Sequence, residues 1–208
     1  MKIACLSNGP FLLSDASGAA VRLRRENGAA VQAGASVALC RCGGSANKPF
    51  CDGTHAKNGF SDRNTADAGR NRRIAYAGKQ ITIFDNRSIC AHAGFCTDGL
   101  KNVFRMNAEP WIDPDGATLA EVIATIEKCP SGALSYARDG IEAPPPLREP
   151  MITVTNDGPY AVTGGVELAA VPFGDGASRE HYTLCRCGGS KNKPFCDGTH
   201  WRIGFKDP

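Results

Sequence analysis

A sixteen-residue stretch with three cysteines and one histidine occurs twice in this chain. The copies span residues 40–55 and 185–200, and they differ only where Ala46 is replaced by Lys191. Soft thiolates combined with an imidazole bind zinc or iron–sulfur clusters in preference to hard cations. We therefore take eight residues as candidate metal ligands: Cys40, Cys42, Cys51 and His55 in the first copy, and Cys185, Cys187, Cys196 and His200 in the second.

The spacing of these residues indicates two pairs of ligands in each copy. One residue separates Cys40 from Cys42, so a turned loop can direct both sulfurs at one metal atom. Cys51 and His55 are four residues apart, and they share one helical face if a helix begins near Asp52. Two such pairs suit a two-iron cluster, but spacing alone also allows a structural zinc site. A disulfide framework is a weaker alternative, because a chain of 208 residues does not need one.

The pattern C-x-C-x2-S-x3-P-x-C-D-G-T-H in both copies resembles the CDGSH iron–sulfur (NEET) domain, with Thr54 and Thr199 in place of its serine. The resemblance implies one 2Fe–2S cluster per motif, held by three cysteines and one histidine. Replacing a thiolate by a neutral imidazole removes a negative charge, so such a cluster is easier to reduce than a four-cysteine cluster. A coordinated histidine also keeps a second ring nitrogen that exchanges protons, which couples electron uptake to proton uptake.

Composition is that of an ordinary globular protein. The hydrophobic content is 42% and the formal net charge is +3, which gives no argument for nucleic-acid binding. No window approaches eighteen apolar residues, and Asn8, Gly9 and Pro10 interrupt the apolar start, so we expect neither a membrane span nor a signal peptide. We expect a cytoplasmic protein in a reducing compartment, without a membrane or nucleic-acid partner.

The two ends of the chain follow the same plan. We expect residues 1–60 and 144–208 each to form a small β-rich CDGSH unit, and in the first unit we expect strands at 11–13, 21–23 and 36–39. Units of this size bury too little surface to be stable alone. The resemblance to single-motif family members, which form homodimers with a shared β-region, implies that the two units pair as an intramolecular pseudo-dimer. The chain is then expected to be a monomer.

Residues 61–143 are expected to form an inserted α+β domain with its connectors. Thr118 and Glu121 have the spacing of a capping box, and apolar residues follow at helical intervals. The elements predicted here are a hairpin of residues 73–76 and 80–84, an amphipathic helix over 119–128 and a closing strand over 132–136.

A third cysteine set, Cys90, Cys96 and Cys129, lies in this inserted domain, and Pro130 follows the last of them. Bacterial ferredoxins bind iron–sulfur clusters through C-x2-C-x2-C and a remote C-P pair. Residues 72–138 resemble the divergent single-cluster 4Fe–4S ferredoxin-like domain. The resemblance implies that the three cysteines are cluster ligands.

Ala93 stands where the middle cysteine of the ferredoxin pattern is expected, so the type of the central cluster is open. Three cysteines suffice for a 3Fe–4S cluster. His92 is next to the altered position and could supply the fourth ligand of a 4Fe–4S cluster. The third alternative is an empty site.

The leading expectation for function is one-electron transfer among clusters in one chain, with a redox protein as partner. We expect no enzymatic activity, since Ser45 and Ser190 have no nearby base motif and the sequence has neither a dinucleotide fingerprint nor a P-loop. One alternative is cluster storage, redox or pH sensing, and donation to an apo-acceptor protein. Another is a zinc-stabilised interaction module.

Overall fold

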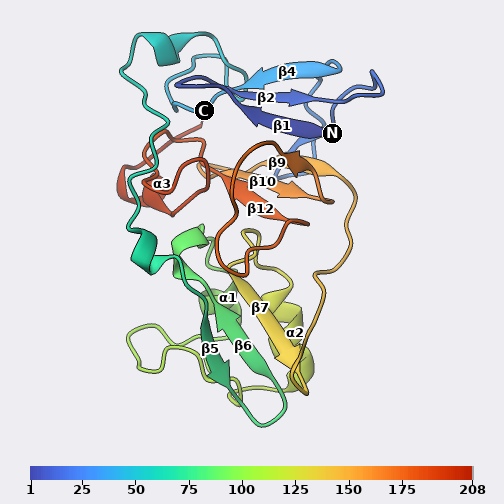
Figure 1. The fold of residues 1–208 in the computed structure, drawn as a ribbon, viewed down its shortest axis with the longest axis vertical. Coiled ribbons are helices and arrows are strands. Elements are labelled where there is room, and N and C mark those ends of the chain that lie inside the picture. Colours follow the sequence, from blue (N-terminus) through green and yellow to red (C-terminus); the bar gives the residue numbers. More distant parts are fainter. Residues whose placement is uncertain (208) are drawn as a thin grey trace.

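Three four-stranded sheets and a few short helices form the protein in the computed structural model, which describes residues 1–207 (Figure 1). Two sheets stack at one end of the molecule. The third sheet lies at the other end with helices α1 (Phe95–Gly99) and α2 (Leu119–Ile126). The predicted α+β class, with two small β-rich units and a separate α+β domain, is confirmed.

The two stacked sheets are built in the same way. The first has the order β11 (Glu167–Leu168), β1 (Lys2–Cys5), β2 (Phe11–Ser14) and β4 (Ser36–Leu39). The second has the order β12 (Tyr182–Leu184), β10 (Tyr160–Thr163), β9 (Met151–Val154) and β3 (Leu23–Arg25).

Each repeat contributes one edge strand to the sheet of the other repeat. Strand β3 of the first repeat pairs in parallel with β9 of the second, with Leu23 opposite Ile152. Strand β11 of the second repeat pairs in parallel with β1 of the first. The predicted strand at residues 21–23 is therefore found two residues later, because its register is determined by a partner strand in the other repeat. This exchange joins the two units into a pseudo-dimer within one chain.

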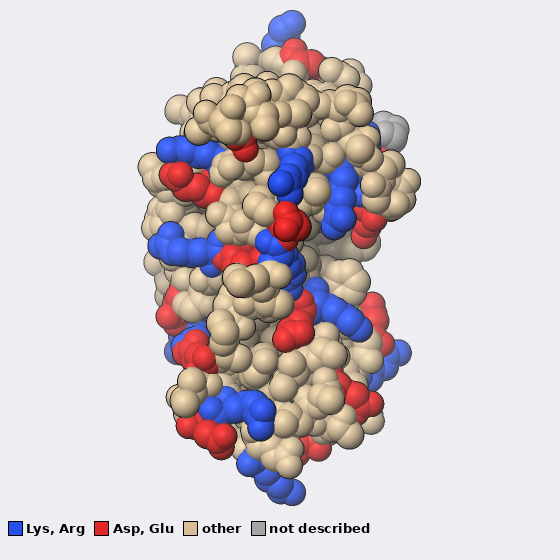
Figure 2. Space-filling model, turned by 90° about the vertical axis from the view of Figure 1, so that its right-hand side faces the viewer, with Lys and Arg blue, Asp and Glu red and all other residues tan. Residues whose placement is uncertain are grey.

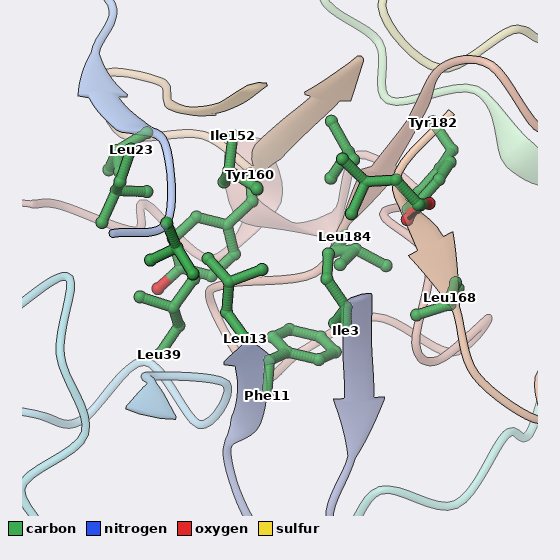
Figure 3. Close-up of a cluster of buried hydrophobic side chains, with 14 of the residues drawn as sticks. Ile3, Phe11, Leu13, Leu23, Leu39, Ile152, Tyr160, Leu168, Tyr182 and Leu184 are labelled. Atoms are coloured by element: carbon green, nitrogen blue, oxygen red, sulfur yellow. Dashed lines mark hydrogen bonds between the residues drawn. The ribbon is translucent and has the colours of Figure 1, made fainter. Parts of the chain in front are cut away.

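A single hydrophobic core lies between the two stacked sheets. Figure 3 shows side chains from both repeats pointing toward one another. The alternating inward positions of β2 and β10 explain this arrangement, since every second residue of a strand points to the same face. The most deeply buried members include Ile3, Phe11 and Leu13 from the first repeat and Ile152, Tyr160 and Val162 from the second.

The third sheet belongs to the inserted domain and has its own core. Its strands are β5 (Ile74–Ala77), β6 (Thr82–Asp85), β7 (Leu134–Arg138) and β8 (Ile141–Glu142), in that order. The predicted hairpin is present, with β5 antiparallel to β6. The predicted closing strand is also present as β7, displaced by two residues toward the C-terminus.

Helix α2 begins as its sequence predicts. The Thr118 hydroxyl accepts from the backbone N–H of Glu121, and the Glu121 carboxylate accepts in return from the N–H of Thr118. The helix buries Val122 and Ile126 against the third sheet, and its buried Thr125 lines a cavity of the inserted domain. It ends at Ile126, two residues before the predicted end.

Candidate metal centres

The first motif forms a loop that follows strand β4 and brings its four candidate ligands together in pairs. The sulfurs of Cys40 and Cys42 are 3.9 Å apart. The Cys51 sulfur lies 3.3 Å from Nδ1 of His55. Nδ1 is thus the ring nitrogen positioned to bind a metal beside Cys51, which leaves Nε2 for a proton.

The second motif repeats this geometry after strand β12. The sulfurs of Cys185 and Cys187 are 3.8 Å apart, and the Cys196 sulfur is 3.4 Å from Nδ1 of His200. The structure therefore places each of the eight candidate ligands beside one other candidate ligand, as two pairs in each loop. Two pairs of ligands in each loop would fit the donor set of a binuclear cluster.

The helical turn after each third cysteine begins later than predicted. It spans Thr54–Ala56 in the first loop and Thr199–Arg202 (α3) in the second, rather than starting at the aspartate. Gly53 and Gly198 precede these turns with φ of 87° and 78°, a left-handed conformation that glycine adopts without strain.

The aspartate of each motif joins the two halves of its loop. Asp52 accepts from the N–H of Thr54 at 3.0 Å and of Ala46 at 2.8 Å, and Asp197 accepts from the corresponding groups. The hydrogen bond from Ala46 is the main cause that lowers the pKa of Asp52 to about 2. This carboxylate therefore stays ionised and fixes the loop at neutral pH.

Backbone N–H groups point at four of the ligand sulfurs. Gly44 and Gly53 donate toward Cys42 and Cys51 at 3.4 Å, and Gly189 and Gly198 donate toward Cys187 and Cys196 at 3.4 and 3.5 Å. Donors of this kind stabilise negative charge on sulfur and raise the reduction potential of a bound cluster.

Burial makes two of these thiols hard to ionise without a cation. It raises the pKa of Cys40 and of Cys196. The sulfur contact between Cys185 and Cys187 lowers the pKa of Cys185 to about 6 and raises that of Cys187, since the pair ionises one thiol more easily than two. Burial also lowers the pKa of His200, which favours the neutral, metal-binding imidazole. A donor set with these properties fits a bound metal cluster.

Buried arginines between the paired cysteines were not anticipated from the sequence. Arg186 is 1% exposed and donates to the carbonyl oxygens of Gly158 and Thr155 at 2.9 and 2.7 Å. Arg41 occupies the same place in the first loop and contacts Asp62. The signal in the sequence was an arginine at the same position of both motifs.

The two loops meet directly. Cys42 and Cys187 form an isolated antiparallel β-bridge. A Cβ atom at Gly43 would lie 2.6 Å from the Cys187 carbonyl oxygen, and one at Gly188 would lie 2.5 Å from that of Cys42. Because the two backbones come this close, both positions require glycine. The same contact places the two ligand sets next to each other across the pseudo-dimer.

The third cysteine set lines one cavity of about 240 Å³ in the inserted domain. Cys90, Cys96 and Cys129 all reach it, together with His92 and Ala93. Burial raises the pKa of Cys90 to about 11 and also raises that of Cys96. Three thiols around one cavity fit the expected cluster site.

Asp85 and His92 also line this cavity, and the structure shows the surroundings of each. Asp85 is 1% exposed, and neither of its oxygens has a hydrogen-bond donor within residues 1–207. Burial raises its pKa to about 6. The alternation of buried Ile83 and Asp85 on one face of β6 could have located it. The ring of His92 lies against Gly198 of the second motif, so this residue stands between the two sites.

Among the side chains of residues 1–207, no group of three or more histidine, cysteine or acidic side chains converges as a mononuclear metal site. None of the ten cysteines there forms a disulfide. No helix in this part of the chain combines the length and apolarity needed to cross a bilayer.

Comparison with family models matches both loops and the domain between them. The model described as iron-binding zinc finger CDGSH type matches residues 6–56 and 157–201. The model described as divergent 4Fe–4S mono-cluster matches residues 76–139. The chain is an iron–sulfur-binding protein in which two CDGSH repeats flank a divergent 4Fe–4S domain.

Curated relatives cover only a part of the chain. An uncharacterized protein of Escherichia coli K12, YjdI, is 43% identical over 61 residues, which are 29% of this chain and 80% of the relative. The protein of the same name from Escherichia coli O157:H7 matches with the same values. No solved structure matches the chain.

Proposed function

We propose that this protein binds two 2Fe–2S clusters, each through three cysteines and one histidine, and that it transfers single electrons. One observation carries the proposal: each CDGSH loop presents its ligands as two close pairs, and the two loops touch at Cys42 and Cys187. When bound, each cluster takes up and releases one electron. The residues around it hold the ligands, donate hydrogen bonds to sulfur and limit water access.

The arrangement of the three sites supports transfer within the chain. The first and second ligand sets adjoin at the β-bridge between Cys42 and Cys187. The second set adjoins the central cavity through His92, whose carbonyl oxygen accepts from Trp201 Nε1 at 3.1 Å. We propose that electrons pass along this row of sites to or from a redox protein, with the chain acting as a carrier and not as an enzyme.

Surface charge supports a protein partner better than a nucleic acid. On the face seen in Figure 2, Lys and Arg are interspersed with Asp and Glu. A nucleic-acid interface usually has an extended basic patch. The shared core of the two repeats and the free thiols favour a monomer in the reducing cytoplasm.

Metal analysis of anaerobically purified protein tests the proposal. We expect about four irons per chain if the central cavity is empty, and about seven or eight if it holds a 3Fe–4S or 4Fe–4S cluster. Acid-labile sulfide should be present in proportion, and the protein should be red-brown. Stoichiometric zinc in colourless protein would instead identify a zinc-stabilised interaction module.

Cluster storage and donation is the second candidate function, and the half-exposed Cys51 and His55 of the first loop favour it. Incubation with an apo-ferredoxin separates the two functions. Transfer of clusters within minutes would favour donation, whereas stable clusters with fast electron exchange would favour the carrier.

A further inference from the structure

The two CDGSH loops have nearly the same sequence but different surroundings. Cys196 and His200 are only 2% and 4% exposed, whereas Cys51 and His55 are partly exposed. The difference is confined to this half of each loop, because Cys40 and Cys185 are equally buried at 1%. Something outside the motif therefore covers the cysteine–histidine pair of the second loop.

The covering segments come from the connector and the inserted domain, and we call residues 64–65 and 88–92 the cap. The Asn192 side chain donates to the Ser88 carbonyl oxygen at 2.8 Å, and the N–H of Thr65 donates to the Lys191 carbonyl oxygen at 2.8 Å. At the ligands themselves, the His92 ring lies against Gly198, and Trp201 Nε1 donates to the His92 carbonyl oxygen.

Within residues 1–207, no segment covers the first loop in the way that the cap covers the second. A Cβ atom at Gly53 would have no neighbour within 4 Å, whereas one at Gly198 would lie 2.9 Å from Cγ of His92. Ala56 stands where the second loop has Trp201, whose ring packs on His200 with the centroids 5.3 Å apart. The second loop is thus built to receive the cap, and the cysteine–histidine pair of the first loop is left partly exposed.

We propose that the cap makes the two ligand sets unequal, so that the second retains its metal while the first is the exchangeable site, open to an apo-acceptor protein or a chelator. The inference rests on the proposed function, in that each set must hold a 2Fe–2S cluster. Its physical basis is local opening: a competing ligand reaches a buried metal–ligand pair only after the covering segment has moved away. Cys51 and His55 need no such movement.

Chelator-driven metal loss from the complete, anaerobically loaded protein at neutral pH tests this inference. The 2Fe–2S signal of reduced samples is followed by electron paramagnetic resonance, and released iron is counted. We expect two phases of equal size, with the slower phase at least about tenfold slower, which corresponds to about 1.4 kcal/mol of additional barrier. His55→Cys should slow only the fast phase, which assigns it to the first loop.

Two matched pairs of variants test whether the cap is the cause. Gly198→Ala and Gly53→Ala introduce the same methyl group at similar positive φ, but only the first displaces His92. Trp201→Ala gives the second loop the residue of the first, and Ala56→Trp is the reverse exchange. We expect Gly198→Ala and Trp201→Ala to accelerate the slow phase several-fold, and we expect both first-loop variants to leave it unchanged.

The outcomes separate this inference from the proposed function. Two intact 2Fe–2S clusters that are lost at a single rate would overturn the inference alone. Equal effects of Gly198→Ala and Gly53→Ala on their own loops would do the same, because loop strain and not the cap would then control release. Protein that contains zinc and shows no 2Fe–2S signal would overturn both.

Discussion

At the scale of single residues, the histidine of each loop distinguishes these sites from four-cysteine clusters. Nδ1 of each ring faces the neighbouring cysteine sulfur, at 3.3 Å in the first loop and 3.4 Å in the second. A neutral ligand at this place lowers the total negative charge that the protein must stabilise when an electron is added. The reduction potential should therefore depend on His55 and His200.

The double variant His55→Cys and His200→Cys tests this dependence. Each substitution replaces a neutral ligand by an anionic thiolate, so the midpoint potential should fall toward the value of about −400 mV that is typical of plant-type ferredoxins. Potentiometric titration with spectroscopic detection measures the change. An unaltered potential in a fully loaded variant would mean that these histidines are not ligands.

At the scale of elements, the contact between the two loops requires an exceptionally close backbone approach. Gly43 has φ of 77°, and the carbonyl group of Cys187 occupies the space that a Cβ atom at Gly43 would fill. Gly18 provides a matched position, since its φ is also 77° but no atom lies within 4 Å of a Cβ placed there.

Substitution of these two glycines by alanine separates backbone strain from steric conflict. Gly18→Ala should cost only the left-handed strain of about 1–2 kcal/mol. Gly43→Ala should lower the melting temperature further and reduce the iron bound by both loops, because Cys42 and Cys187 must move apart. Thermal unfolding and iron content measure the two effects. Similar values for both variants would argue against a tight contact between the loops.

At the scale of the whole molecule, neither CDGSH repeat is complete by itself. The first repeat loses the partner of β3 when β9 is removed, and it loses Tyr160, whose hydroxyl donates to the carbonyl oxygens of Cys40 and Pro49 at 2.9 and 3.0 Å. The inserted domain has a separate core, but its loop at His92 covers the second motif. The first motif therefore depends on contacts from the second repeat, and the second motif is covered in part by the inserted domain.

A fragment of residues 1–60 should not fold as a monomer. Its core residues would face water without the inward side chains of β9 and β10, and the edge of β1 would lack β11. Circular dichroism and size-exclusion chromatography should detect an unfolded chain or a dimer that restores the exchange. A stable, monomeric fragment with bound cluster would contradict the need for the second repeat.

Much of the chemistry is readable in the sequence because it depends on residues that are close along the chain. The spacing of Cys40, Cys42, Cys51 and His55 predicts the two ligand pairs, and Thr118 with Glu121 predicts the start of α2. The duplication of the motif also predicts the pseudo-dimer, since a unit of this size needs a partner to bury its apolar residues.

Tertiary structure decides what depends on residues far apart along the chain. The register of β3 is determined by its pairing with β9. Asp85 lies at the central cavity because the fold brings it to the same place as Cys90 and Cys129. The clearest case is His200, which is 4% exposed although the identical motif leaves His55 partly exposed. Motif sequence specifies which atoms can bind a metal, but solvent access depends on which distant segment packs over them.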